Sequence, residues 1–185
     1  MKFDETLFSP QVVWLTGLPA SGKTTLARCL AERLRSFEQP VKVLDGDELR
    51  KTINKDLGFS VGDRKIAVTR AAQLARSLSD TGVIVVVAMV SPVQAHRESA
   101  RAEIEPIPFL EVWVNTTLDV CIQRDPKGLY KKALSGVLSE LTGIGQDYES
   151  PISADVTIDG AEDLESNLNK VLERLAVLGG PERIP

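Results

Sequence analysis

The chain has 185 residues, 43% of them apolar and 5% aromatic, and its formal net charge at pH 7 is -4. A chain of this length can bury one sizeable core, so we expect a single domain over residues 1–185. The acidic balance argues against nucleic acid as a partner, because binding to a polyanion needs a dense basic face.

Three further features indicate the environment of the protein. The longest apolar run, at 83–90, is far shorter than the ~20 residues that cross a bilayer, so no membrane association is expected. The first ten residues carry two acids and no apolar core of the kind found in a secretory signal. Cys29 and Cys121 lie in apolar-periodic segments, where buried free thiols are more typical than a disulfide. We therefore expect a cytoplasmic protein.

Short β-branched runs alternate with segments of helical periodicity along the whole chain. In chain order, we expect a strand at 12–16, a helix at 24–35, a strand at 41–44, a helix opening at 48–50, a helix at 64–79, a strand at 83–90, a helix at 94–105, a strand at 109–114, a short helix at 118–123, a strand at 155–158 and a closing amphipathic helix marked by Leu164, Leu168, Val171 and Leu175.

This order of elements predicts the fold class. The run at 83–90 is apolar on both faces, which suits the middle of a parallel sheet covered by helices on both sides. Repeated βα units imply an α/β fold with a doubly wound, mainly parallel sheet, whose ligands bind at the carboxyl ends of the strands. The irregular, Gly- and Lys-rich stretch at 124–151 is a candidate lid over that edge.

The segment GLPASGKT, at 17–24, follows the first strand and opens the first helix. It satisfies the phosphate-binding pattern G-x-x-x-x-G-K-[ST], in which backbone N–H groups and the helix N-terminus face a phosphate. Lys23 would reach the β and γ phosphates, and the Thr24 hydroxyl would serve Mg²⁺. The ATP-binding residues expected here are Gly17, Leu18, Pro19, Ala20, Ser21, Gly22, Lys23, Thr24 and Thr25.

Asp45 and Asp47 follow the second strand and open a short helix. An aspartate that only caps a helix is a common alternative. We favour a functional interpretation, with this strand next to the strand of the phosphate-binding loop. One carboxylate would then hold metal-bound waters, and the other would orient or deprotonate an attacking hydroxyl.

Several other polar or aromatic residues leave two interpretations open. Phe59, in a polar loop, could plug the core or offer a surface on which a base stacks. His96 is expected to be solvated at a helix start. Arg64, Arg97 and Arg101 could be solvated helix charges or could bind an anionic co-substrate.

The sequence resembles the adenylylsulfate kinase family in six blocks spread over about residues 12–152. These blocks are WLTGLPASGKTT, LDGDELR, NKDLGFSVGDR, a strand ending in VSP, RDPKGLYKKAL and LTGIGQDYESP. The resemblance implies transfer of the γ-phosphoryl group of MgATP to the 3′-hydroxyl of adenosine 5′-phosphosulfate, in sulfate assimilation or sulfation. It also implies a possible homodimer.

By resemblance, individual residues acquire expected roles. Lys23, Asp47 and Ser91 would be catalytic, with Asp47 acting on the 3′-hydroxyl, and Thr24 and Asp45 would hold Mg²⁺. Arg124 would lie on the ATP side of the lid. The residues expected to bind adenylyl sulfate are Asp47, Arg50, Phe59, Arg64, Ser91, Lys127 and Leu141.

The chain departs from the family pattern mostly on the acceptor side. Ala67 stands where the family usually has Asn, and Leu141 stands where it usually has a Phe that stacks on the nucleotide base. These departures keep two alternatives open. One is a divergent relative that phosphorylates another nucleotide-linked anion, and the other is an ATP-binding module without catalysis.

Overall fold

A computed structural model describes residues 8–179 of the chain. Most of the stretch searched above for a secretory signal, residues 1–7, lies outside the described residues. Within them are the strands β1 (Val12–Thr16), β2 (Val41–Asp45), β3 (Ile84–Ala88), β4 (Phe109–Val114) and β5 (Val156–Ile158), and the helices α1 (Lys23–Ser36), α2 (Gly46–Lys51), α3 (Val61–Ser79), α4 (Gln94–Ile104), α5 (Leu118–Arg124), α6 (Leu129–Leu134) and α7 (Leu164–Gly179).

The five strands form one sheet in the order β2-β3-β1-β4-β5. Every strand pair is parallel, with Val12 opposite Val85 on one side and opposite Phe109 on the other. All five residues of β1 and all five of β3 are buried, as expected for strands covered on both faces. The α/β fold with a doubly wound parallel sheet is thus confirmed.

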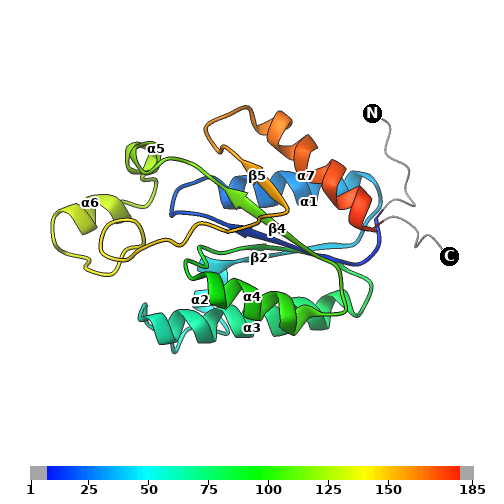
Figure 1. Ribbon diagram of the computed structural model, residues 1–185, viewed down its shortest axis with the longest axis horizontal. Coiled ribbons are helices and arrows are strands. Elements are labelled where there is room, and N and C mark those ends of the chain that lie inside the picture. The colour runs from blue at the N-terminus through cyan, green and yellow to red at the C-terminus, as the bar shows by residue number, and fades with distance from the viewer. Residues whose placement is uncertain (1–7, 180–185) are drawn as a thin grey trace.

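Helices cover both faces of the sheet (Figure 1). Helices α1 and α7 lie on one face, where alternate strand residues such as Val13, Leu15 and Val112 pack against Leu30 and Leu172. Helices α3 and α4 lie on the opposite face, against a second cluster that includes Trp14 and Val87. Since successive strand residues point to opposite faces, each strand supplies both clusters.

The lid stretch at 124–151 extends away from the end of the sheet, with α5 and α6 at its base and tip (Figure 1). A small apolar cluster is built from Tyr130, Ala133 and Leu141 of this stretch together with Cys121 of α5. The stretch was expected to be irregular, and this is wrong for residues 129–134, which form α6. Tertiary burial of Tyr130 and Ala133 therefore holds a helix that is too short to form on its own.

Two smaller observations concern membrane-spanning helices and the thiols. None of the helices within residues 8–179 combines the length and apolar character needed to pass through a bilayer. Cys29 and Cys121 are free thiols, but only Cys121 is buried, and Cys29 is partly accessible at the edge of the α1–α7 core.

Candidate active site

The loop between β1 and α1 is built to expose backbone N–H groups. Gly17 has φ +148°, and a Cβ there would lie 2.5 Å from the Val114 carbonyl oxygen, so the close approach of β4 requires glycine. Gly22 precedes α1 with φ +108°, again in the left-handed region that favours glycine. The loop therefore has the geometry expected of a phosphate-binding loop.

Lys23 is enclosed by this loop. Its ammonium Nζ donates to the carbonyl oxygens of Gly17, at 2.9 Å, and Leu18, at 2.7 Å, and to the hydroxyl of Ser21, at 3.2 Å. Burial lowers the pKa of Lys23 to about 8, and the carboxylates of Asp45 and Asp47 partly oppose that shift. The Lys23 ammonium thus donates to oxygens of the loop itself. When a nucleotide binds, phosphate oxygens would take the place of these loop oxygens as acceptors.

A carboxylate lies beside the first turn of α1. The Thr24 hydroxyl donates to Oδ2 of Asp45 at 2.7 Å, and Oδ1 of the same carboxylate accepts from the Asp47 backbone N–H at 2.9 Å. Asp45 is therefore the N-cap of α2 as well as the partner of the phosphate-binding loop. The capping interpretation is confirmed, and the contact with Thr24 leaves the same carboxylate free to serve as the predicted metal-side group.

The expectation that β2 is next to the strand of the phosphate-binding loop is wrong. Strand β3 lies between β2 and β1. Asp45 still reaches Thr24, because the carboxyl ends of all the parallel strands meet at one edge of the sheet, where α1 also begins.

The lid contributes two basic side chains to the same edge. The Lys127 ammonium forms an ion pair with the Asp47 carboxylate, so the lid is linked to the start of α2. Arg124 Nη2 donates to the Gly160 carbonyl at 2.8 Å, and its Nη1 lies 3.5 Å from the Ser21 carbonyl oxygen. Two predicted site residues far apart in the sequence, Asp47 and Lys127, thus lie in direct contact.

A second group of predicted residues gathers around Phe59. Its ring is 45% exposed, which rules out a core plug. The Arg50 guanidinium lies 4.1 Å from the ring centroid and that of Arg64 lies 5.7 Å from it. Burial lowers the pKa of both arginines, although guanidinium groups remain charged. This group presents two cations and an aromatic face.

The lid reaches this group as well. The Glu140 carbonyl accepts from Arg64 Nη2 at 3.1 Å, and the Gln146 side chain donates to the Phe59 carbonyl at 3.1 Å. Leu141, between them, is buried in the apolar cluster of the lid. Ala67, the other departure from the family pattern, is buried in α3.

Ser91 follows β3 in a strained conformation, with φ +44°. It is buried, and its hydroxyl accepts a hydrogen bond from Trp14 Nε1 at 3.1 Å. The serine is therefore fixed at the carboxyl end of the sheet, with its hydroxyl oriented by the core.

The expectation of a solvated His96 is wrong. The side chain is only 7% exposed because the first turn of α4 is packed, and burial lowers its pKa, with the charge of Lys65 acting in the same direction. Arg97 is also buried, and it pairs with Glu111 at 2.9 Å. Arg101 pairs with Asp155 at 2.8 Å. Both of these arginines thus serve internal ion pairs.

Two lid tyrosines make contacts that were not expected from the sequence. The Tyr130 hydroxyl donates to the Pro19 carbonyl at 3.0 Å, and the Tyr148 hydroxyl lies 2.9 Å from that of Thr16, the last residue of β1. Burial raises the pKa of Tyr148 to about 12, so this hydroxyl stays protonated. The signal was available, because these are the only two tyrosines of the chain and both stand in the blocks quoted above.

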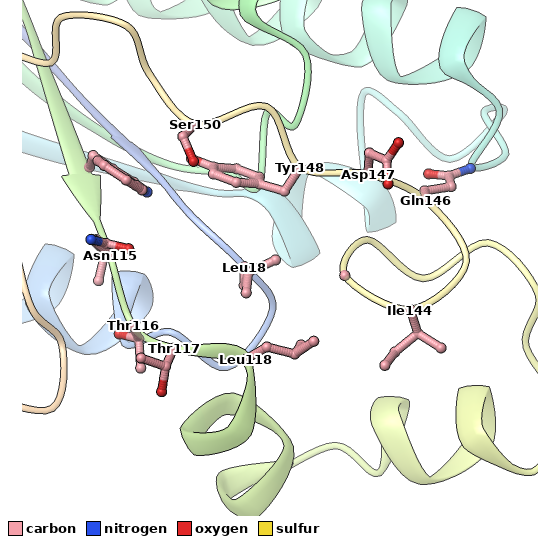
Figure 2. A pocket seen from close by; sticks show the side chains of 13 residues that line it. Leu18, Asn115, Thr116, Thr117, Leu118, Ile144, Gln146, Asp147, Tyr148 and Ser150 are labelled. Atoms are coloured by element: carbon pink, nitrogen blue, oxygen red, sulfur yellow. The ribbon is translucent and has the colours of Figure 1, made fainter.

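A cavity of about 370 Å³ lies between the end of β4, Leu18 of the phosphate-binding loop and the returning lid residues 143–150. Figure 2 shows Tyr148 and Asp147 on its upper side and Thr117 and Leu118 below. The residues that line it, all within the described part of the chain, include no lysine or arginine. The cavity is therefore not where the groups suited to phosphate gather.

Within residues 8–179, no three His, Cys, Asp or Glu side chains converge as a metal site of their own. A Mg²⁺ ion that arrives with a nucleotide needs less, since it keeps several waters and takes one or two protein oxygens beside the phosphates. The Thr24 hydroxyl and the Asp45 carboxylate, 2.7 Å apart, are oxygen donors of that kind. The residues present fit such an ion.

A parallel α/β sheet, a phosphate-binding loop before its first helix and a lid carrying basic side chains define a P-loop kinase. The comparisons with known proteins agree. The sequence pattern of the family described as "Adenylylsulphate kinase" matches residues 9–159. An adenylyl-sulfate kinase of Geotalea uraniireducens is 41% identical over 182 residues, covering 96% of this chain and 88% of that protein.

Solved structures lead to the same family. The APS kinase of Mycobacterium tuberculosis in complex with AMPPNP and APS has a TM-score of 0.88 and 37% identity, covering 90% of this chain and 98% of that one. A hexameric APS kinase from Thiobacillus denitrificans has a TM-score of 0.70 and 27% identity, covering 94% of this chain and 30% of that one. The chain belongs to the adenylylsulfate kinase family.

Proposed function

We propose that this protein transfers the γ-phosphoryl group of ATP to the 3′-hydroxyl of adenosine 5′-phosphosulfate. The observation that carries the proposal is that the phosphate-binding loop and the lid each contact one of the two acids at the same edge of the sheet. The phosphate-binding loop reaches Asp45 through Thr24, and two residues on, Asp47 faces the lid cation Lys127. Membership of the family supports adenylyl sulfate as the acceptor.

On the ATP side, the chain's own groups act by position and charge. Backbone N–H groups of the phosphate-binding loop and the Lys23 ammonium would hold the phosphates and stabilise the charge on the transferring group. Arg124, beside the Ser21 and Gly160 carbonyl oxygens, would bound the nucleotide on the lid side. Thr24 and Asp45 would hold Mg²⁺, which, when bound, neutralises phosphate charge.

On the acceptor side, Asp47 would orient the 3′-hydroxyl and accept its proton. Arg50 and Arg64 would bind the anionic phosphosulfate, and the accessible face of Phe59 would carry the base. When the lid closes, the Lys127 ammonium would leave the Asp47 carboxylate and pair with an anionic group of the substrate instead. Leu141 would contribute only from the apolar cluster of the lid, in place of a second stacking ring.

Ser91 would bind the acceptor rather than form a covalent intermediate. Its hydroxyl is buried and already accepts from Trp14. A direct in-line transfer needs no such intermediate, because positioning and charge stabilisation are sufficient for phosphoryl transfer.

The test is turnover with MgATP and adenylyl sulfate, following ADP release and locating the new phosphate by mass spectrometry. We expect Lys23→Ala to abolish turnover and Asp47→Ala to lower kcat by about 10²- to 10⁴-fold, the usual contribution of a general base. Glu48→Ala is the matched control, because Glu48 lies next to Asp47 but, among the described residues, forms an ion pair only with exposed Lys51.

The alternatives have their own outcomes. ATP binding without transfer to adenylyl sulfate, but with transfer to another nucleotide-linked anion, would identify a divergent acceptor. ATP binding without transfer to any acceptor would identify a non-catalytic module.

Two further properties belong to this proposal. The hexameric relative supports an assembly of copies, for which a homodimer is the simplest state and sedimentation the measurement. The free thiols of Cys29 and Cys121 support a reducing compartment, the cytoplasm.

A further inference from the structure

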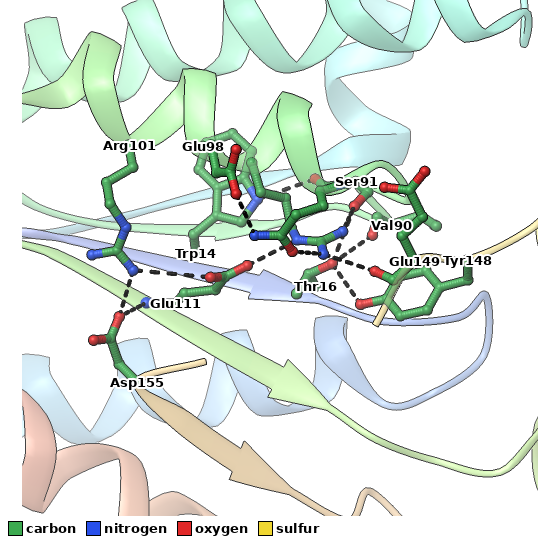
Figure 3. Close-up of polar contacts among 12 residues, drawn as sticks. Trp14, Thr16, Val90, Ser91, Glu98, Arg101, Glu111, Tyr148, Glu149 and Asp155 are labelled. Atoms are coloured by element: carbon green, nitrogen blue, oxygen red, sulfur yellow. Dashed lines mark hydrogen bonds and ion pairs between the residues drawn. The ribbon is translucent and has the colours of Figure 1, made fainter. Parts of the chain in front are cut away.

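Arg97 is the most deeply buried charged side chain that the phosphoryl-transfer machinery above does not use. Its guanidinium is 1% exposed and donates to four acceptors: the Glu111 carboxylate at 2.9 Å, the Ser91 carbonyl at 2.7 Å, the Glu149 carbonyl at 2.7 Å and the Gln94 side chain. Figure 3 labels Ser91, Glu111 and Glu149, the residues that supply three of these acceptors.

Stability alone is a poor reason for such an arrangement. Removing two charges from water is costly, and replacing a buried ion pair with apolar residues is often neutral or stabilising. Burial raises the pKa of Glu111, and the charge of Arg97 opposes that shift, which shows that the carboxylate lies in a poorly solvated place. The buried ion pair is therefore better explained by the segments of the chain that Arg97 holds in place.

Arg97 holds two segments that meet at the site. One is the turn at Ser91, whose left-handed backbone is strained and whose carbonyl Arg97 captures. The other is the pair of residues 148–149, which we call the return segment because the lid rejoins the sheet there. Its Glu149 N–H donates to the Pro92 carbonyl at 2.8 Å, and the Glu149 carboxylate accepts from the Gln94 N–H.

The return segment is also attached to the strand of the phosphate-binding loop. The Tyr148 ring lies 5.7 Å from the Arg97 guanidinium carbon, and its hydroxyl contacts that of Thr16. Thr16 in turn donates to the Val90 carbonyl at 2.7 Å. One guanidinium thus joins the end of β3, the end of β1 and the end of the lid.

We propose that Arg97 is a positioning residue for phosphoryl transfer, which fixes Ser91 and the return segment relative to the phosphate-binding loop. The acceptor then meets a preformed surface. This inference rests on the proposed function for its kinetic consequence. It goes beyond that function by assigning the placement of the acceptor to a residue that touches no substrate.

The first test compares Arg97→Lys with Arg101→Lys. A lysine at 97 keeps the charge but cannot serve four acceptors in fixed directions. Arg101 is the matched control. It lies one turn further along α4, pairs with Asp155 at 2.8 Å and more distantly with Glu111 at 3.9 Å, and lies over a ring, but within the described residues it contacts neither Ser91 nor the return segment.

For Arg97→Lys we expect the KM for adenylyl sulfate to rise at least about tenfold with a lower kcat, since misplacement by ~1 Å can cost 10²-fold in rate. The dissociation constant of ATP alone should change less than about twofold, because the residue touches no part of the loop that binds ATP. Arg101→Lys should change neither value.

A double variant separates positioning from folding. Arg97→Met with Glu111→Leu removes both buried charges, so Tm should recover toward that of the wild type. The KM for adenylyl sulfate should stay high, because Ser91 and Glu149 still lack their donor. Recovery of KM together with Tm would show that Arg97 serves only stability, and would overturn the proposal.

Hydrogen exchange tests the same contact without any substrate. The Glu149 amide should exchange faster in Arg97→Lys and in the double variant than in the wild type or Arg101→Lys. Unchanged exchange would contradict the proposal. If wild-type protein does not turn over adenylyl sulfate, the proposed function fails, and the exchange rates alone decide whether Arg97 holds the return segment.

Discussion

At the scale of single residues, Lys23 shows how the fold prepares a charge for its ligand. Burial lowers the pKa of its ammonium from 10.5 to about 8, and three oxygens of its own loop accept hydrogen bonds from the ammonium. A bound phosphate would favour the charged form. ATP binding and protonation of Lys23 are therefore linked.

The sign of the expected pH dependence follows. Below about pH 8 the ammonium is present and ATP binds tightly, whereas above it the free protein loses that proton and affinity falls. The limiting slope is about tenfold per pH unit for a single group. Calorimetric titration with ATP from pH 6.5 to pH 9.5 is the measurement.

Lys23→Met is the control for this prediction. Its ATP affinity should be low and nearly independent of pH between pH 7 and pH 9.5, because the titrating group is gone. A wild-type affinity that stays constant up to pH 9.5 would contradict a lowered pKa in the free protein.

At the scale of elements, α6 is a helix that depends on its neighbours. Gly128 before it offers no side-chain cap, so the Asp125 carboxylate accepts from the N–H groups of Tyr130 and Lys131 instead, and the buried Tyr130 hydroxyl donates to the Pro19 carbonyl of the phosphate-binding loop. The Tyr130 hydroxyl thus joins the lid to the phosphate-binding loop, beside the apolar contacts that Leu18 and Ala20 of the loop make with the same cluster.

Removing that hydroxyl should loosen the lid. We expect Tyr130→Phe to lower the free energy of unfolding by about 1 kcal/mol, the usual net value of one hydrogen bond. Amide exchange at residues 130–131 should also become faster. Leu134→Ala is the control, since its side chain on the same helix is 63% exposed, and it should change neither quantity. Equal amide exchange rates in the two variants would show that the hydrogen bond from Tyr130 to Pro19 does not stabilise the lid.

The same elements show what local sequence could and could not predict. Long periodic segments such as α1 and α3 were found to within a few residues, because the apolar stripe that defines them is also the stripe they bury. Helix α6 was missed because six residues show no period, and its stability comes from contacts with the distant Pro19 and Cys121. His96 was misjudged for the same reason, since its cover comes from other elements.

At the scale of the whole molecule, strand order was the part least available from local pattern. The glycine-rich loop after β1 and the acids at the end of β2 lie at the carboxyl edge of the sheet, as expected, yet β2 was expected next to β1, and β3 lies between them. A signal existed. Lys42 within β2 is typical of an edge strand, whereas the uninterrupted apolar residues of β3 need a neighbour on each side.

The contacts that unite the site were likewise beyond sequence reasoning. Arg97 and Arg101 share one helix and one residue type, but one is buried against Ser91 and the other is partly exposed beside Asp155. Only the packing of α4 on the sheet separates their roles.

The two faces of the sheet should unfold together, as a single domain over the described residues requires. Leu172 of α7 is fully buried on one face, whereas Trp14 reports from the other. We expect Leu172→Ala to lower the free energy of unfolding by about 2–5 kcal/mol through loss of packing. The near-ultraviolet circular dichroism signal of the tryptophans and the far-ultraviolet signal of the helices should then shift to one common, lower Tm.

Val177→Ala on the same helix is the control, because Val177 is 71% exposed, and its Tm should match the wild type. Two separate transitions in Leu172→Ala would mean that the α1–α7 layer unfolds independently, and would contradict a single cooperative domain.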